Sequence, residues 1–296
     1  MPQLLEINEL EKVFAPYRDR LNYYNYWIQP DNDLEKAAAE GEVIPATQLL
    51  DPNFLRSLLM EWDRTLGSNN LKVAGALWSK YYCLTAYPLV LGAMSLGGIG
   101  LDLTLARTKV VLSREALPKP MDGKGRPVRL IFEDCPAVVY APRCGDPEVA
   151  AHALPVESLA ELHQQVGRAF FKEHFGPLFE AFQTTTGVSP RVLWGNLSYG
   201  IYLFWEYLCE NLGCEVAWHE DAPAFFETLE HAAIAAGPNP LYRPARPRPL
   251  EFIERPGPAQ IRTSCCLWYK VPGAEKCGPC PLLWPVNREN SRRAVA

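Results

Sequence analysis

The chain has 296 residues, of which 48% are hydrophobic and 21% are charged, and its formal net charge is −5. This composition excludes an intrinsically disordered chain and provides apolar side chains for a large core in one or two domains. From Leu241 onward ten Lys or Arg stand against four Asp or Glu, a net charge of +6, so the preceding part carries −11. An acidic body and a basic end without a long run of Lys or Arg argue against a nucleic-acid-binding protein.

The first residues predict packing helices and no export signal. Residues 4–14 have apolar positions at helical spacing and carry acidic residues where a signal peptide has a basic patch. We therefore expect a cytoplasmic protein whose nine cysteines are reduced thiols. A second helix is expected to begin after Asp51, the N-cap, with Pro52 in its first turn, and to end at Leu66 before Gly67.

A stretch of 21 residues between Lys80 and Asp102 carries no charge and is long enough to cross a bilayer. Pro88 and four glycines interrupt it, which favours a buried helix that leads into a loop. We expect this helix to begin at about Asn70 and to end near Pro88 or Gly92. Any contact with a membrane is expected to be peripheral at most.

Three short segments of alternating or β-branched residues follow, at 101–105, 109–112 and 126–132. The Asp122-Gly-Lys-Gly turn stands between the second and the third, so a small antiparallel sheet is expected. The two Gly-x-Gly pairs, Gly98-Ile-Gly100 and Gly123-Lys-Gly125, lack the third glycine of a dinucleotide fingerprint. No nicotinamide, flavin, P-loop or hydrolase motif is visible.

Helical patterns dominate the second half of the body. Ser158 opens one helix that is expected to continue to Gly187, and Ser189 with Pro190 opens another that ends at Gly213. Asp221 is expected to cap a third helix that ends at Gly237. Three histidines, His163, His174 and His231, fall within these patterns without a second metal ligand at suitable spacing, so core or surface roles are favoured.

A proline-rich segment follows these helices, in which five prolines between 238 and 249 alternate with Arg243, Arg246 and Arg248. Proline stiffens such a segment into an extended linker. We place the boundary between a body of residues 1–249 and a C-terminal segment of residues 250–296 at its end. The three arginines are expected to offer a docking face to an acidic protein.

Four cysteines lie close together in the C-terminal segment, in the pattern Cys-Cys-x10-Cys-x2-Cys formed by Cys265, Cys266, Cys277 and Cys280. Thiolates are soft ligands that select zinc, copper(I) or iron–sulfur clusters. Only Cys277 and Cys280 form a turn typical of zinc sites, and adjacent cysteines point to opposite faces unless the chain bends there. A two-iron cluster is wider than one zinc ion and relaxes that demand.

The four cysteines allow other interpretations. A pair of disulfides needs an oxidising compartment. Cys277-Gly-Pro-Cys280 also copies the dithiol motif of thioredoxin, but Pro281 and Pro285 do not suit the helix that this motif opens. An iron–sulfur cluster is therefore favoured, with zinc and disulfides as the alternatives.

Two cysteine-containing stretches resemble the FhuF-like ferric siderophore reductases. They are Arg262-Thr-Ser-Cys-Cys-Leu-Trp-Tyr and, ten residues after the vicinal cysteines, Cys277-Gly-Pro-Cys-Pro-Leu-Leu. Upstream, Trp78-Ser-Lys-Tyr-Tyr and Arg191-Val-Leu-Trp-Gly-Asn also look like segments of this family. The resemblance implies that the four cysteines bind a [2Fe–2S] cluster and that the body binds a ferric siderophore of the hydroxamate type.

The resemblance and the motifs together predict a ferric siderophore reductase with an α+β fold, a mostly helical body with a small antiparallel sheet and a C-terminal iron–sulfur segment. Since no nucleotide or flavin motif is visible, the electron is expected from a protein donor such as a ferredoxin or a flavoprotein reductase. Two alternatives remain, a zinc-stabilised siderophore-binding or assembly protein without redox activity and a cluster-based redox sensor. The residues predicted to contact the substrate are Arg262, Trp268, Tyr269, Lys270 and Asn196.

Basic residues flank the four cysteines. Arg262, Lys270 and Lys276 are expected to offset the negative charge of a thiolate-ligated cluster, because second-shell charge tunes such a centre.

Overall fold

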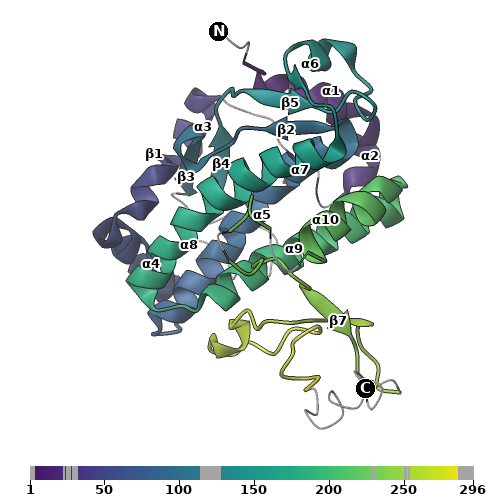
Figure 1. Cartoon of the computed structure of the whole chain (residues 1–296). Coiled ribbons are helices and arrows are strands. Elements are labelled where there is room, and N and C mark those ends of the chain that lie inside the picture. Colours follow the sequence, from purple (N-terminus) through teal and green to yellow (C-terminus); the bar gives the residue numbers. More distant parts are fainter. Residues whose placement is uncertain are drawn as a thin grey trace.

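The computed structural model describes residues 4–22, 24, 28, 33–113, 128–228, 231–235, 237–249, 252 and 254–285. These residues form a mostly helical body with small sheets, and a C-terminal segment with little regular structure lies at one end of it (Figure 1). The predicted α+β fold class is thereby confirmed. The turn expected at Asp122 and Gly123 lies outside the described residues.

The body is built around one long helix, α5 (Leu71–Gly97), which packs against α4 (Pro52–Leu66) and α9 (Pro190–Leu212) (Figure 1). The prediction that α5 ends near Pro88 or Gly92 is wrong, because Pro88 lies inside the helix and is buried. An interior proline costs about 3 kcal/mol of helix stability. Packing on nearly every side of α5 outweighs this cost, since almost all residues from 73 to 97 are buried.

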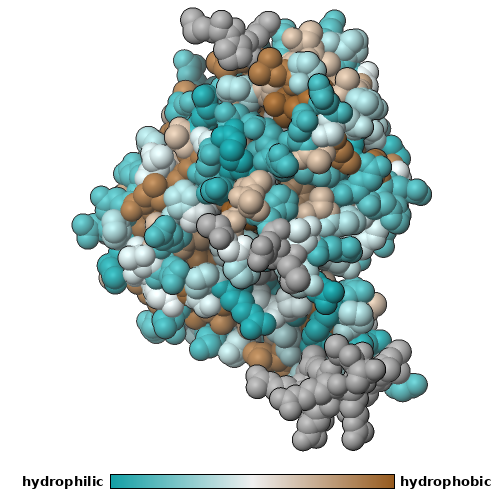
Figure 2. All heavy atoms as spheres, in the orientation of Figure 1, coloured by the Kyte–Doolittle hydropathy of each residue, from teal (hydrophilic) through white to brown (hydrophobic). Residues whose placement is uncertain are grey.

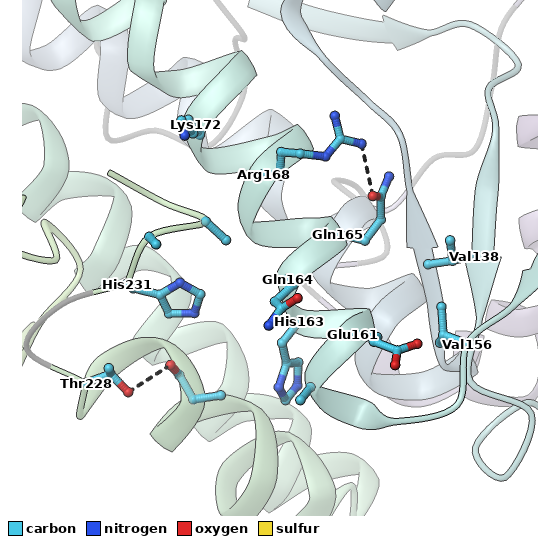
Figure 3. A pocket seen from close by; sticks show the side chains of 14 residues that line it. Val138, Val156, Glu161, His163, Gln164, Gln165, Arg168, Lys172, Thr228 and His231 are labelled. Atoms are coloured by element: carbon cyan, nitrogen blue, oxygen red, sulfur yellow. Dashed lines mark hydrogen bonds between the residues drawn. The ribbon is translucent and has the colours of Figure 1, made fainter. Parts of the chain in front are cut away.

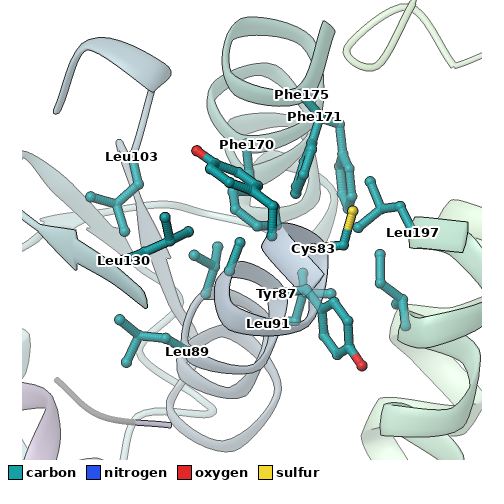
Figure 4. Close-up of a cluster of buried hydrophobic side chains, with 14 of the residues drawn as sticks. Cys83, Tyr87, Leu89, Leu91, Leu103, Leu130, Phe170, Phe171, Phe175 and Leu197 are labelled. Atoms are coloured by element: carbon teal, nitrogen blue, oxygen red, sulfur yellow. The ribbon is translucent and has the colours of Figure 1, made fainter. Parts of the chain in front are cut away.

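The main core lies around α5. Figure 4 shows Cys83, Tyr87 and Leu91 of this helix among side chains from several other elements. The aromatic residues Phe170, Phe171 and Phe175 form one part of this cluster, and they come from a π-helical turn, η6 (Gly167–Phe175). Within the described residues, no helix is both long and apolar enough to cross a membrane.

Local capping fixes the helix ends as the sequence predicted. The Asp51 carboxylate accepts hydrogen bonds from the backbone N–H groups of Asn53 and Phe54, at 2.7 and 3.1 Å, and α4 ends at Gly67. Caps at Ser158 and Ser189 are also present. The helix predicted from Ser158 to Gly187 is continuous, but it consists of α7 (Leu159–Val166), η6 and α8 (Gly176–Thr186).

Two small sheets cover the body, where the sequence predicted one. Strands β1 (Gly41–Pro45), β3 (Thr108–Ser113) and β4 (Val128–Phe132) form an antiparallel sheet in the order β1-β3-β4. Strand β2 (Ile99–Leu101) instead pairs with β5 (Ala137–Val139), because the 3-10 helix η5 (Leu105–Arg107) turns the chain between β2 and β3. Strand β6 (Leu154–Pro155) extends the second sheet in parallel with β5.

Asp221 does not cap a long helix, and this prediction is wrong. It ends the π-helical turn η7 (Ala217–Asp221), and α10 (Ala222–Phe226) after it has only five residues. The Asp221 carboxylate is fully buried and binds His163, Arg143 and Ser95 instead, at 2.7, 2.9 and 2.6 Å. Burial opposes its ionisation, but the hydrogen bond from His163 and the charge of Arg143 outweigh burial and lower the pKa of Asp221.

The C-terminal segment begins as a two-stranded ribbon. Strand β7 (Ala245–Pro247) pairs antiparallel with β8 (Gln260–Arg262), with Ala245 opposite Arg262. The ribbon therefore spans the predicted boundary at residue 249, which stays a prediction. In the space-filling view, hydrophobic side chains on this face of the molecule lie in small separate groups among hydrophilic ones (Figure 2).

The remaining described elements are short helices that complete the body and one that follows the vicinal cysteines. They are η1 (Ile7–Leu10), α1 (Glu11–Phe14), η2 (Ala15–Tyr17), α2 (Arg18–Leu21), α3 (Leu34–Glu40), η4 (Ala46–Leu50), α6 (Pro147–Ala151) and η9 (Trp268–Lys270).

Candidate metal centre

The vicinal cysteines follow strand β8 after two residues, and the backbone turns left-handed just beyond them. Leu267 has a left-handed backbone, with φ of 65°, between Cys266 and η9. Its backbone N–H donates to the Cys265 sulfur over 3.4 Å. This left-handed residue follows the adjacent cysteines and does not lie between them.

The second pair of cysteines lies on a tight turn that the rest of the segment holds in place. The backbone N–H of Cys280 donates to the Cys277 carbonyl over 2.9 Å. Trp284, which is buried, donates from its ring nitrogen to the Gly278 carbonyl over 2.7 Å. The backbone N–H of Arg262 donates to the Pro279 carbonyl over 3.2 Å, so β8 and the turn are joined directly.

The thiols of the two pairs interact across this junction. A hydrogen bond between the thiols of Cys266 and Cys277 lowers the pKa of Cys266 and raises that of Cys277. Burial raises the pKa of Cys265. As they stand, no three or more His, Cys, Asp or Glu side chains of the described residues are grouped closely enough to hold a metal ion.

Two basic residues lie next to these thiols. Arg262 is buried, and its positive charge and that of Lys80 both lower the pKa of Cys266. Lys80 comes from α5, far away in the sequence, and it is exposed. The site thus combines four sulfur donors with two cations supplied by different parts of the chain.

The donor set fits a thiolate-bound iron–sulfur cluster. Four soft sulfurs match its ligand preference, and nearby cations compensate its negative charge. Two buried polar groups beside the cysteines, Arg262 Nε and Ser264 Oγ, have no hydrogen-bond partner within the described part of the chain. Both can donate to an anionic sulfur, and buried donors of this kind require an acceptor.

The cysteine-bearing segment is attached to the body through α9 and α5. Arg262 Nη2 donates to the Asn196 amide oxygen over 2.6 Å, and the Asn196 amide nitrogen donates to the Ala76 carbonyl of α5 over 3.1 Å. The Arg262 guanidinium also lies over the Tyr199 ring, 5.0 Å from its centre. At Gly195, a Cβ atom would lie 1.8 Å from Ser264 Oγ, so only glycine permits this approach.

The residues predicted to contact substrate fall into two groups, and their role in substrate binding stays a prediction. Asn196 and Arg262 are buried together in the junction just described. Trp268 and Tyr269 are half-buried on η9, where Trp268 packs against the main core, and Lys270 is exposed.

Sequence reasoning missed Lys80 and Tyr199 at this site. A signal was present, because the two upstream segments with family resemblance contain Lys80, Gly195 and Asn196. Their shared feature is contact with the C-terminal segment, and Arg191 in the second one donates to the Thr263 carbonyl over 3.2 Å.

Two cavities lie in the body on opposite faces of α10. The larger, about 880 Å³, includes His163, which Asp221 holds, together with His231, Arg168 and Lys172 (Figure 3). All its lining residues precede residue 234. The smaller, about 470 Å³, is lined by Tyr202, Trp218, Ala222, Pro223, Phe226, Glu227, Arg243, Pro244 and Ala245, and so reaches the ribbon of the C-terminal segment.

Comparison with known proteins identified two family models. The model described as "Ferric iron reductase FhuF-like transporter" matches residues 76–243, which are 168 of the 296 residues (243 − 76 + 1). The model described as "FhuF 2Fe-2S C-terminal domain" matches residues 262–282, which include all four cysteines of the site. No curated protein matches the chain.

Among solved structures, the chain is similar to the petrobactin biosynthesis protein AsbB from Bacillus anthracis str. Sterne. The identity is 16% and the TM-score 0.43, over 56% of this chain. The match covers 31% of AsbB, so the chain spans less than a third of that protein.

The close approach at Gly195 leads to a prediction. Gly195→Ala should loosen the C-terminal segment, because the new methyl group overlaps Ser264. We expect a loss of about 1 to 3 kcal/mol in stability, typical of an overpacked contact, and faster proteolysis between residues 237 and 262. Thermal unfolding and timed proteolysis of the full chain measure these effects.

The double variant Gly195→Ala with Ser264→Gly removes the overlap and should restore resistance to protease. Gly145→Ala is the matched control, since nothing lies within 4 Å of a Cβ atom there. If Gly195→Ala behaves like Gly145→Ala, the contact with Ser264 does not hold the segment in place.

Proposed function

We propose that this chain, which belongs to the FhuF-like ferric iron reductase family, is a cytoplasmic ferric siderophore reductase that transfers single electrons. The observation that carries the proposal is the site itself. Four cysteines within a 2Fe–2S domain lie beside two cations, on a segment attached to a body large enough to bind a chelate. Cys265, Cys266, Cys277 and Cys280 are the proposed ligands.

When bound, the [2Fe–2S] cluster supplies one electron at a time. The chain supplies the ligands and the compensating charge. Arg262 is held by Asn196 and by the Tyr199 ring, so its charge stays fixed beside the sulfurs in a partly buried site. Charge acts more strongly there than in water, which favours the uptake of an electron.

The proposed substrate is an Fe(III) siderophore of the hydroxamate type. Its oxygen ligands are hard and hold Fe(III) much more tightly than the softer, less charged Fe(II). One electron converts Fe(III) to Fe(II), and the weakened chelate releases its iron. This reaction requires proximity and a suitable potential rather than an acid–base residue, and a protein donor replaces the electron.

Two alternative functions make different demands on the chain. A zinc-stabilised siderophore-binding or assembly protein needs the cysteines but no iron. A cluster-based redox sensor needs iron but no substrate cavity. The match to a 2Fe–2S domain favours iron over zinc, and the cavity that reaches the ribbon favours a reductase over a sensor.

The first prediction concerns the metal. The protein purified without oxygen should contain about two irons and two sulfides per chain and absorb visible light, as a thiolate-ligated [2Fe–2S] protein does. Serine at any of Cys265, Cys266, Cys277 or Cys280 should lose or shift that absorption. Elemental analysis and visible spectroscopy measure this.

Cys209→Ser is the control, because Cys209 is a half-buried cysteine on α9, outside the matched 2Fe–2S domain. Its spectrum should equal that of the parent. Stoichiometric zinc without iron in the parent protein would establish the zinc alternative instead.

The second prediction concerns the substrate. A ferric hydroxamate chelate should reoxidise the anaerobically reduced protein at a rate that saturates with chelate concentration, because a bound acceptor is positioned before transfer. Stopped-flow spectroscopy measures the rate. The gallium(III) chelate, similar in shape but not reduced under these conditions, should compete. A rate that rises linearly with chelate and ignores gallium contradicts a binding site and favours the sensor.

The third prediction concerns the electron donor. Docking at the linker arginines stays a prediction, since Arg243 is exposed while Arg246 donates to the Trp284 carbonyl and Arg248 to the Arg255 and Gly257 carbonyls. We also propose that the exposed Lys270 and Lys276, which flank the cysteines, attract an acidic donor. Complementary charge mainly accelerates encounter and is screened over about 10 Å at 0.1 M salt.

The double variant Lys270→Gln with Lys276→Gln should slow reduction by a ferredoxin roughly tenfold at low salt, and the difference should vanish at high salt. Reduction by dithionite should be unchanged. Lys36→Gln with Lys172→Gln, two exposed lysines of the body, is the matched control. Equal slowing by both pairs would show that net charge, not this face, sets the rate.

A further inference from the structure

The smaller cavity lies directly against the cysteine-bearing part of the chain. Pro244 and Ala245 form part of its wall. Ala245 pairs with Arg262 in the ribbon, and the backbone N–H of Thr263 donates to the Pro244 carbonyl over 3.0 Å. Cys265 follows only two residues later. The larger cavity has no lining residue from this ribbon.

A row of packed aromatic side chains leads from this cavity toward the thiols. Trp218 and Tyr202 line the cavity, with their ring centres 5.2 Å apart. Tyr202 stacks on Tyr199 at 6.0 Å with an angle of 8° between the rings, and Tyr199 lies beneath Arg262 at 5.0 Å. The row ends at Arg262, whose positive charge acts on the Cys266 thiol.

The chemistry of the cavity favours a ligand with apolar faces and no net charge. Tyr202, Trp218 and Phe226 supply aromatic surface. Arg243 and Glu227 supply one positive and one negative charge, and both side chains are exposed. An Fe(III) tris-hydroxamate is uncharged, because three singly charged ligands neutralise the ion, whereas a tris-catecholate carries three negative charges. Desolvating such a trianion here would leave it largely uncompensated.

The phenol of Tyr202 adds a hydrogen-bond donor. Burial, reinforced by Glu206, raises the pKa of Tyr202, so the hydroxyl keeps its proton at neutral pH. It donates to the Glu206 carboxylate over 3.4 Å, a long hydrogen bond that a closer acceptor can replace. The oxygens of a hydroxamate are acceptors of that kind.

Arg243 lines the cavity, and its backbone hydrogen-bonds both to α10 and to the chain just before the cysteines. Its backbone is left-handed, with φ of 47°, a conformation that non-glycine residues rarely adopt. Its N–H donates to the Phe226 carbonyl over 3.0 Å, and its carbonyl accepts from Thr263 Oγ1 over 3.1 Å. A strained residue retained at a cavity wall is typical of a functional site.

We propose that this cavity, lined by Tyr202, Trp218, Phe226, Glu227 and Arg243, binds the ferric siderophore and selects an uncharged chelate over a trianionic one. The proposal rests on the proposed function, since it names where the substrate of that reaction binds. The row through Tyr199 to Arg262 then places the bound chelate next to the cysteine-bearing segment.

Calorimetric titration of the full chain, with its iron–sulfur cluster in place, with a gallium(III) tris-hydroxamate tests the site. No electron transfer to the chelate takes place in this experiment. Trp218→Leu should weaken binding about tenfold, the loss expected for one well-packed aromatic contact. Glu227→Trp is a second variant that fills the cavity from an exposed position, and it should weaken binding at least as much. The parent should bind the tris-hydroxamate at least tenfold more tightly than the gallium tris-catecholate.

His231→Gln with Lys172→Gln, in the larger cavity, is the control and should bind as the parent does. The site is overturned if both small-cavity variants keep the parent affinity, or if the control alone weakens binding. In either case saturable reoxidation of the parent would leave the proposed function standing. A parent that neither binds the gallium chelate nor is saturably reoxidised would instead remove the function and the site together.

Discussion

The site depends on the contacts of the buried Arg262 guanidinium. It hydrogen-bonds to Asn196 of α9, lies over Tyr199, and places a positive charge beside Cys266, while its backbone N–H holds the turn between Cys277 and Cys280. One residue thus orders both cysteine pairs and fixes them to the body. A buried cation is costly without partners, so the site needs anionic sulfur as much as the sulfur needs the cation.

The body's side of the junction with the cysteine-bearing segment comes from α5 and α9. Each helix contributes to it from one face. Ala76 and Lys80 stand four residues apart on α5, so the carbonyl that binds Asn196 and the second cation lie on one side of that helix. On α9, Arg191, Gly195, Tyr199 and Tyr202 recur at intervals of four, four and three. This face runs from the cysteine-bearing segment to the smaller cavity. Helix α9 therefore connects the proposed cluster site with the proposed substrate site.

Features set by neighbours in the sequence were predictable, and features set by distant partners were not. The caps at Asp51, Ser158 and Ser189 act within a few residues, and the cysteine spacing is itself a local pattern. Asp221 had the sequence pattern of another cap, but its carboxylate binds His163 and Arg143, which are far away in the sequence.

Pro88 looked like a helix end for the same reason, because only tertiary packing explains why α5 continues through it. The contacts of α9 with Thr263 and Ser264 join residues more than 60 positions apart in the sequence, so no local pattern predicts them. The same holds for the basic residues from Leu241 onward. Composition shows their net charge of +6, but not which of them make contacts within the folded chain.

Arg246 donates to the Trp284 carbonyl, and Arg248 lies over the Trp284 ring. Arg262 places its charge near the thiols, whereas Lys270 and Lys276 remain exposed in the chain between the cysteine pairs. Hydrogen bonds to carbonyl groups hold Arg246 and Arg248 in place, whereas Lys270 and Lys276 are exposed and their charge acts over the screening length. In the proposed function, the exposed lysines therefore attract the donor and the buried Arg262 fixes the site. Along the chain, Arg262 precedes both cysteine pairs, and Lys270 and Lys276 lie between the two pairs.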